Sequence, residues 1–210
     1  MTALPQPKRQ RRKEARPAEI MAAALRLFSD RGFAATRLED VAEAAGVSKA
    51  TIYLYFDSKA DLFKAIVRDV ASPRVGAIEA FIDDFDGPAT ELLHGLYRHA
   101  SAIIGSSEMR SIIKVVMAEA GNFPEIAEFY RREIAFRGLH NIARIIERGV
   151  ASGEFRQCDP MPTAQSVIFP LLMHALATEA FGPMPEFAPE KFLPSHLDFV
   201  LRGLAAEKEA

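Results

Sequence analysis

The segment from Leu38 to Phe56, LEDVAEAAGVSKATIYLYF, constrains the fold of this chain most strongly. Its first part carries apolar residues at the i, i+3, i+4 and i+7 spacing of a helix with one buried face: Leu38, Val41, Ala42 and Ala45. Gly46 can adopt the left-handed conformation that ends such a helix, and Ser48 can cap a second one in which Ile52 and Phe56 face inward. Two short helices joined by a glycine turn predict a helix-turn-helix, whose second helix is suited to a DNA major groove.

Start and stop signals predict helices on both sides of this segment. Pro17 suits a first helical turn, and the apolar stripe behind it predicts a helix over 17–31 that stops at Gly32. The spacing of a capping box occurs twice, at Thr36 with Glu39 and at Ser58 with Asp61. We therefore expect further helices to begin near residues 37 and 59.

The rest of the chain shows only helical periodicity. Pro73 is expected to end or bend the helix that starts near residue 59. Amphipathic segments follow at 73–86, 89–105, 108–120, 124–151, 161–181 and 190–206, and no segment alternates with period two. The sequence thus predicts an all-α fold without a sheet. We divide it into a disordered basic arm (1–16), a helix-turn-helix domain (17–64) and a helical domain (65–210).

Charge is segregated along the chain. Residues 1–64 hold 12 Lys or Arg against 8 Asp or Glu, whereas the remaining residues hold 14 against 20. A basic first third suggests that this part meets a polyanion, although a solvated charged face would give the same count. No run of 18 uncharged apolar residues is present, so no membrane span and a cytoplasmic location are expected. The single cysteine, Cys158, cannot form a disulfide within the chain.

Residues 20–67 resemble the DNA-binding segment of the TetR/AcrR family of bacterial transcriptional regulators. They contain Gly-Phe, Val-Ala, Ala-Gly-Val-Ser, Tyr-x-Tyr-Phe and Leu-Phe in the order of that family. The runs AEAGNFPEIAEFYRREI and GEFRQCDPMPTAQ look like the C-terminal domain of an AefR-like subset. The resemblance implies a three-helix, homeodomain-like helix-turn-helix domain and a C-terminal helical domain for ligand binding and dimerisation. It further implies a repressor that binds a palindromic double-stranded operator and is released by a small apolar or amphipathic effector.

The same resemblance assigns the DNA contacts. They are expected at Thr36, Arg37, Ser48, Lys49, Ala50, Thr51, Tyr53, Tyr55 and Lys59. The second helix of the motif carries no Arg, Asn or Gln able to bind a base edge in bidentate fashion. We therefore expect sparse direct readout, supplemented by Arg37, the basic arm and DNA shape.

The last two long helices are more apolar than one core face requires, so we expect a four-helix homodimer interface there. The apolar residues of these segments, of which one face would serve the core and the surplus the interface, are Ala164, Val167, Ile168, Leu171, Leu172, Ala175, Leu176, Phe192, Leu197, Phe199, Val200 and Leu204. Bulky side chains of the middle helices are candidates for the effector pocket, although methionine and phenylalanine at helical spacing more often belong to the plain core. They are His94, Tyr97, Met109, Ile113, Met117, Phe129, Phe136, Phe169, Met173 and His174.

The sequence shows no motif for catalysis. It has no Gly-rich phosphate loop, no nucleophile elbow and no HExxH pair. The five histidines lack carboxylate or cysteine partners at metal-ligand spacing, so we expect no metal, no cofactor and no enzymatic activity. Two alternatives remain open: an all-helical enzyme or carrier of small molecules whose N-terminal helices are purely structural, and a helical adaptor that binds another protein.

Overall fold

The computed structural model describes residues 8–182, 185 and 188–206, and it is built from helices. They are α1 (Lys8–Arg31), α2 (Leu38–Ala44), α3 (Lys49–Tyr53), α4 (Lys59–Val70), α5 (Ser72–Asp84), α6 (Ala89–Gly105), α7 (Ser107–Glu119), α8 (Pro124–Tyr130), the π-helix η1 (Arg131–Ala135), α9 (Phe136–Ser152), α10 (Pro160–Phe181) and α11 (Pro189–Leu204). The described residues contain one isolated β-bridge, between Phe155 and Ala205, and no strand. The predicted all-α fold is confirmed.

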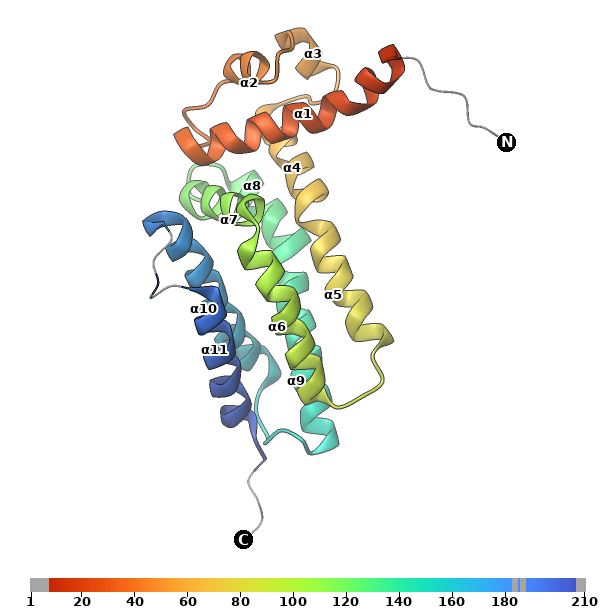
Figure 1. Cartoon of the computed structure of the whole chain (residues 1–210), viewed down its shortest axis with the longest axis vertical. Helices are drawn as coiled ribbons and strands as arrows, with labels where there is room; N and C mark the ends of the chain where they lie inside the picture. Colours follow the sequence, from red (N-terminus) through yellow and green to blue (C-terminus); the bar gives the residue numbers. More distant parts are fainter. Residues whose placement is uncertain (1–7, 183–184, 186–187, 207–210) are drawn as a thin grey trace, which may run out of the picture.

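The helices form two parts along the long axis of the molecule (Figure 1). α1, α2 and α3 lie at one end, and α4 leads from them into a bundle made by α5 to α11. We call the described residues up to 64 the head and residues 65–206 the body. Within the described chain, no helix is both long and apolar enough to cross a membrane.

Local signals in the sequence produce the predicted turn between α2 and α3. Gly46 has a φ of +63°, a conformation that side chains with a Cβ rarely adopt. The Ser48 hydroxyl caps α3 by accepting the Thr51 backbone N–H at 3.1 Å. The Ser58 hydroxyl caps α4 in the same way, with the Asp61 backbone N–H at 3.0 Å. The predicted starts of α3 and α4 are therefore confirmed. They could be predicted because each cap depends on residues within one helical turn.

The first helix is longer than predicted. α1 begins at Lys8, so residues 8–16 are helical and the prediction of a disordered arm is wrong for them; residues 1–7 lie outside the described residues. Arg, Lys, Gln, Glu and Ala are good helix formers, and residues 8–16 consist of nothing else. Pro17 lies inside the helix instead of at its start. The segment predicted as one helix at 124–151 also differs from the prediction, because it is divided into α8, η1 and α9.

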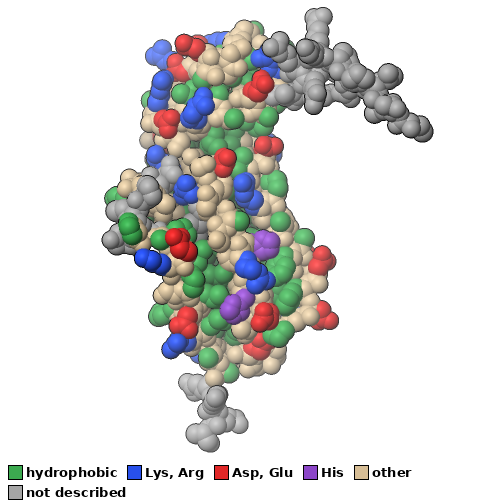
Figure 2. All heavy atoms as spheres, viewed as in Figure 1, with side chains coloured by type: hydrophobic (Ala, Val, Ile, Leu, Met, Phe, Trp, Pro, Cys, Tyr) green, Lys and Arg blue, Asp and Glu red, His purple; other side chains and the backbone are tan. Residues whose placement is uncertain are grey.

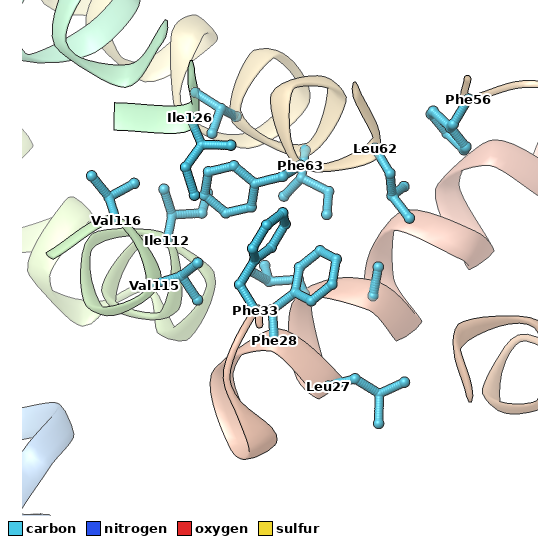
Figure 3. Packing of buried hydrophobic residues seen from close by; sticks show 14 of the residues in the cluster. Leu27, Phe28, Phe33, Phe56, Leu62, Phe63, Ile112, Val115, Val116 and Ile126 are labelled. Atoms are coloured by element: carbon cyan, nitrogen blue, oxygen red, sulfur yellow. The ribbon is translucent and has the colours of Figure 1, made fainter. Parts of the chain in front are cut away.

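One hydrophobic cluster joins the head to the body. The rings of Phe28, Phe33 and Phe63 meet in it with centroids 5.0 to 6.2 Å apart. Ile112, Val115 and Val116 of α7 and Ile126 of α8 belong to the same cluster (Figure 3). A second cluster is formed by α5, α6, α9, α10 and α11. Because the first cluster contains residues of both the head and the body, the head is packed on α7 and α8 and is not attached through α4 alone.

Candidate nucleic-acid interface

Helix α3 presents an outward face at the end of the head. Ile52 and Phe56 are buried and hold the helix on the first cluster. The neighbouring side chains of Lys49, Ala50, Tyr53 and Leu54 are exposed. The predicted recognition helix therefore has the expected inward and outward sides, and Leu54, at 79 % exposure, is its most exposed large apolar residue.

Hydroxyl groups at the start of α3 bind each other. The Ser48 and Thr51 hydroxyl oxygens are 2.8 Å apart, in addition to the capping bond. Thr51 and Tyr55 are half-buried, and the Tyr55 ring lies 6.3 Å from that of Phe56. These predicted contact residues thus lie beside the outward face, where their role toward DNA stays a prediction.

Lys49 has an acidic partner that the sequence interpretation missed. Its ammonium pairs with the Glu39 carboxylate of α2 and lies 5.7 Å from the centre of the Tyr53 ring. The bond to Glu39 raises the pKa of Lys49, and the same bond lowers the pKa of Glu39. Both groups are solvent-exposed, so the pair is easily exchanged for another anion such as a phosphate. The sequence had assigned Glu39 to a capping box with Thr36.

That capping box is wrong. The backbone N–H of Arg37, the true N-cap residue, donates to the Asp40 carboxylate at 3.1 Å. Thr36 is only 1 % exposed, and its hydroxyl lies 2.8 Å from the Gly32 carbonyl and 3.2 Å from that of Leu27. The hydroxyl is therefore used inside the head, whereas the Arg37 side chain is exposed as predicted.

Lys59 is also placed differently from the prediction. Its ammonium donates to the carbonyls of Phe33 at 2.5 Å, Ala34 at 3.1 Å and Thr36 at 2.9 Å. It also lies 4.5 Å above the centre of the Phe33 ring. Burial lowers the pKa of Lys59. An ammonium has three N–H donors, so Lys59 has none left for a phosphate in this arrangement. The side chains of Thr36 and Lys59 thus hold the turn between α1 and α2, and a DNA contact by either residue stays a prediction.

The predicted effector residues do not form one pocket. Met109 and Phe129 are buried in the first cluster, whereas Met117, Phe136, Phe169 and Met173 are 44 to 66 % exposed. Only Ile113 lines the small apolar cavity of the body, which measures about 80 Å³. Its other walls are Ile78, Leu96, Ala100, Ile103, Ile142, Ile168, Leu171, Leu172 and Ala175. Most of the candidates thus do not share one cavity, because helical spacing shows that a face is buried but not against what, and their role toward an effector stays a prediction.

His94 and Tyr97 belong to an open groove between α6 and α11. The groove has a volume of about 620 Å³, an apolar floor that includes Leu193 and Leu197, and charged groups of both signs at Arg98 and Glu190. Histidine, basic and acidic side chains lie among apolar ones on this face of the body (Figure 2). Within the described part of the chain, no group of three or more His, Cys, Asp or Glu side chains is placed to hold a metal ion.

An aromatic stack joins α6, α10 and α11 behind this groove. The Phe192 ring is stacked between His174, at 4.2 Å, and His196, at 5.4 Å, and the Tyr97 hydroxyl lies 3.0 Å from His196 Nδ1. Burial lowers the pKa of both imidazoles below the ordinary value of 6.5. The stack is therefore held by neutral histidines.

This stack predicts a stability that depends on pH. As the pH falls below 6.5 the unfolded chain binds protons on these histidines before the folded chain does, so the free energy of unfolding should decrease. Urea denaturation at pH 7.5 and pH 5.5 measures this decrease. A variant with both His174→Gln and His196→Gln should show a smaller decrease, whereas an equal one would contradict the assignment. Carboxylates with lowered pKa, such as Glu79, lose their contribution only below their ordinary value of 4.5.

Exposed apolar side chains gather on one side of α10 and α11. Phe169 and Met173 lie on the same face of α10 as Pro162 and Ser166. Phe199 of α11 lines a shallow groove together with Pro162 and Ser166. Phe169, Met173 and Phe199 are 57 to 75 % exposed, a larger exposed fraction than that of most other apolar residues of these two helices. Ala164, Val167, Leu171, Ala175, Val200 and Leu204 are buried within the chain itself and form the core face of these two helices, while the dimer interface on the same helices stays a prediction.

Comparison with known proteins identifies both parts of the chain. Residues 20–66 match the model of bacterial regulatory proteins of the tetR family, and residues 91–193 match that of the AefR-like transcriptional repressor C-terminal domain. The transcriptional regulator RutR of Escherichia coli is 44 % identical over 78 residues, which are 37 % of each chain. The regulator YhgD of Bacillus subtilis is 30 % identical over 150 residues, covering 69 % of this chain and 74 % of YhgD.

The fold is shared with solved regulators as well. FadR of Bacillus subtilis, solved in complex with stearoyl-CoA, superposes with a TM-score of 0.73 over 89 % of this chain and 98 % of FadR, at 19 % identity. At that identity the likeness shows the fold alone. Since sequence matches cover the head and most of the body, the chain belongs to the TetR family of bacterial transcriptional regulators.

Proposed function

We propose that this protein is a homodimeric repressor that binds a palindromic operator in the cytoplasm and releases it when a small apolar or amphipathic molecule enters the body. The observation that carries the proposal is the outward face of α3, where Lys49, Ala50 and Tyr53 project from a helix anchored by Ile52. One such helix offers few contacts. Two of them, about 34 Å apart in a twofold dimer, reach successive major grooves of a palindrome.

The size of the apolar cavity supports release by an effector. A typical ligand pocket has a volume of about 300–1,000 Å³, whereas this cavity measures about 80 Å³. An effector that binds here must therefore push apart the helices that line it. Ile113 brings α7 into this wall, so α7 is one of the helices that must move. FadR, which shares the fold, was solved with an acyl-CoA, which fits an effector with an apolar part.

The exposed apolar side of α10 and α11 supports the dimer. Phe169, Met173 and Phe199 lie there at more than half exposure, and their burial against a second copy would remove them from water. The groove lined by His94 and Tyr97 lies between α6 and α11 and is lined by other residues of α11 than Phe199. It can therefore remain open in such a dimer and admit the polar end of an amphipathic effector.

Substitution of Lys49 tests the DNA-binding surface. Lys49→Ala should weaken binding to an operator selected from a random duplex pool by about 5- to 150-fold, the equivalent of about 1–3 kcal/mol for one lost contact. The plot of the logarithm of the binding constant against the logarithm of the salt concentration should also become less steep, by about one unit of slope, because one fewer counterion is released. Fluorescence anisotropy at several salt concentrations measures both effects. The melting temperature should not change, because Lys49 is exposed.

Glu39→Gln is the matched control. It releases Lys49 from its ion pair with Glu39 and removes a negative charge beside the DNA, so binding should be retained or strengthened. If Lys49→Ala leaves binding unchanged, α3 does not read DNA through this face. If the parent protein selects no sequence from the pool and loses DNA to competitor, the alternative of a helical small-molecule carrier is favoured instead.

A further inference from the structure

A buried carboxylate of the body binds the turn between α1 and α2 in the head. Glu119, the last residue of α7, is only 8 % exposed. Its Oε1 accepts the backbone N–H of Ala34 at 3.1 Å, and its Oε2 accepts from the Asn122 amide at 3.3 Å. A buried carboxylate is costly unless its oxygens are hydrogen-bonded, so the bond to Ala34 stabilises this position of α7.

The same turn is held from the opposite side by a cation. The three carbonyls bound by the Lys59 ammonium belong to Phe33, Ala34 and Thr36, so Ala34 is bound by Glu119 through its N–H and by Lys59 through its C=O. The opposite charge of Glu119 raises the pKa of Lys59, against the larger effect of burial. The two charged groups therefore act on one short piece of backbone.

Other residues of this turn also lie beside the end of α7. Gly32 has a φ of +87°, and a Cβ at this position would be in ordinary van der Waals contact with Glu119 Oε1, at 3.5 Å. Phe123, which follows α7, meets the Phe33 ring edge-on with centroids 4.8 Å apart. The turn is thus fixed to the end of α7 by one polar and one aromatic contact. Such tightly packed junctions pass on displacements because they have few intermediate arrangements.

We infer that Glu119, Lys59 and the α1–α2 turn form a polar lock through which α7 sets the position of the recognition helix. The inference rests on the proposed function and assigns its regulation to a positioning residue. Ile113 lies six residues before Glu119 on α7, about 9 Å along the helix. A change at the cavity therefore reaches the lock through one rigid element. From the turn the chain enters α2 directly, and α2 packs on α3.

A double-mutant cycle tests the lock without a known effector. Ile113→Phe overfills the small cavity and serves as the probe for an occupied body. In the parent background it should weaken operator binding about 5- to 150-fold, the usual range for coupling between sites. With Glu119→Ala present, the same change should weaken binding less than about 2-fold, because the displacement of α7 no longer reaches the turn. Glu119→Gln keeps an oxygen acceptor for Ala34 and should restore most of the response.

Two further measurements separate the outcomes. Hydrogen exchange of the Ala34 amide reports on the lock without DNA, and Ile113→Phe should accelerate it about 10-fold. Glu108→Ala is the matched control, because Glu108 lies at the other end of α7 and accepts from Ser106. It should leave the response to Ile113→Phe unchanged. An equal fold-change with and without Glu119, or an Ile113→Phe variant with unaltered Ala34 exchange and operator affinity, overturns the lock. Absence of sequence-specific binding by the parent protein would instead overturn the proposed function.

Discussion

Phe33→Ala is expected to lower the free energy of unfolding by about 3–5 kcal/mol, the usual cost of removing a buried aromatic side chain. Phe33 is 1 % exposed and contacts three other rings: Phe28, Phe63 and Phe123. It also lies under the Lys59 ammonium. Because the first cluster contains residues of both head and body, the loss should appear in probes of both parts. Urea denaturation followed by circular dichroism and by hydrogen exchange measures it.

Two variants sharpen this expectation. Phe136→Ala removes the same side chain at a position that is 44 % exposed, and it should cost less than about 1 kcal/mol. Phe33→Leu keeps much of the apolar volume but loses the ring contacts, so it should fall between the two. A cost below about 1 kcal/mol for Phe33→Ala would show that the head does not depend on this cluster for its attachment to α7.

Charges placed on the exposed side of α10 and α11 should abolish the dimer. A variant with Met173→Glu and Phe199→Glu is expected to run as a monomer in light scattering at micromolar concentrations, since four like charges would meet in the interface. Its affinity for the operator should fall roughly 10³-fold or more, because a single head has little advantage over non-specific binding. The fold should be kept, because both side chains are mostly exposed in the single chain.

Met117→Glu is the matched control for this variant. Met117 is 66 % exposed, lies on α7 and does not line the groove that Phe199 shares with α10. The substitution should leave both the dimer and operator binding as they are in the parent protein. If the double variant remains dimeric, the second copy binds elsewhere. If it becomes a monomer but binds the operator with unchanged affinity, the twofold reading of a palindrome is wrong.

The elements that could be predicted from the residues are those that depend on near neighbours. Gly46, Ser48 and Ser58 fix the ends of α2, α3 and α4 because each acts on backbone groups within one turn. The inward direction of Ile52 and Phe56 also follows from helical spacing. The helix-turn-helix, its outward face and the all-α fold could therefore be predicted from the residues alone.

The contacts of the remaining side chains depend on how the helices pack in the folded chain. Phe169 and Met173 were expected in a pocket and are exposed, while Leu171 and Ala175 of the same helix are buried. Lys59 reaches carbonyls more than 20 residues earlier in the chain, and Glu119 reaches Ala34 across 85 residues. Periodicity and capping act over a single helical turn, whereas these contacts depend on which helices pack together. The position of the lock and the extent of the free apolar surface are therefore properties of the folded chain.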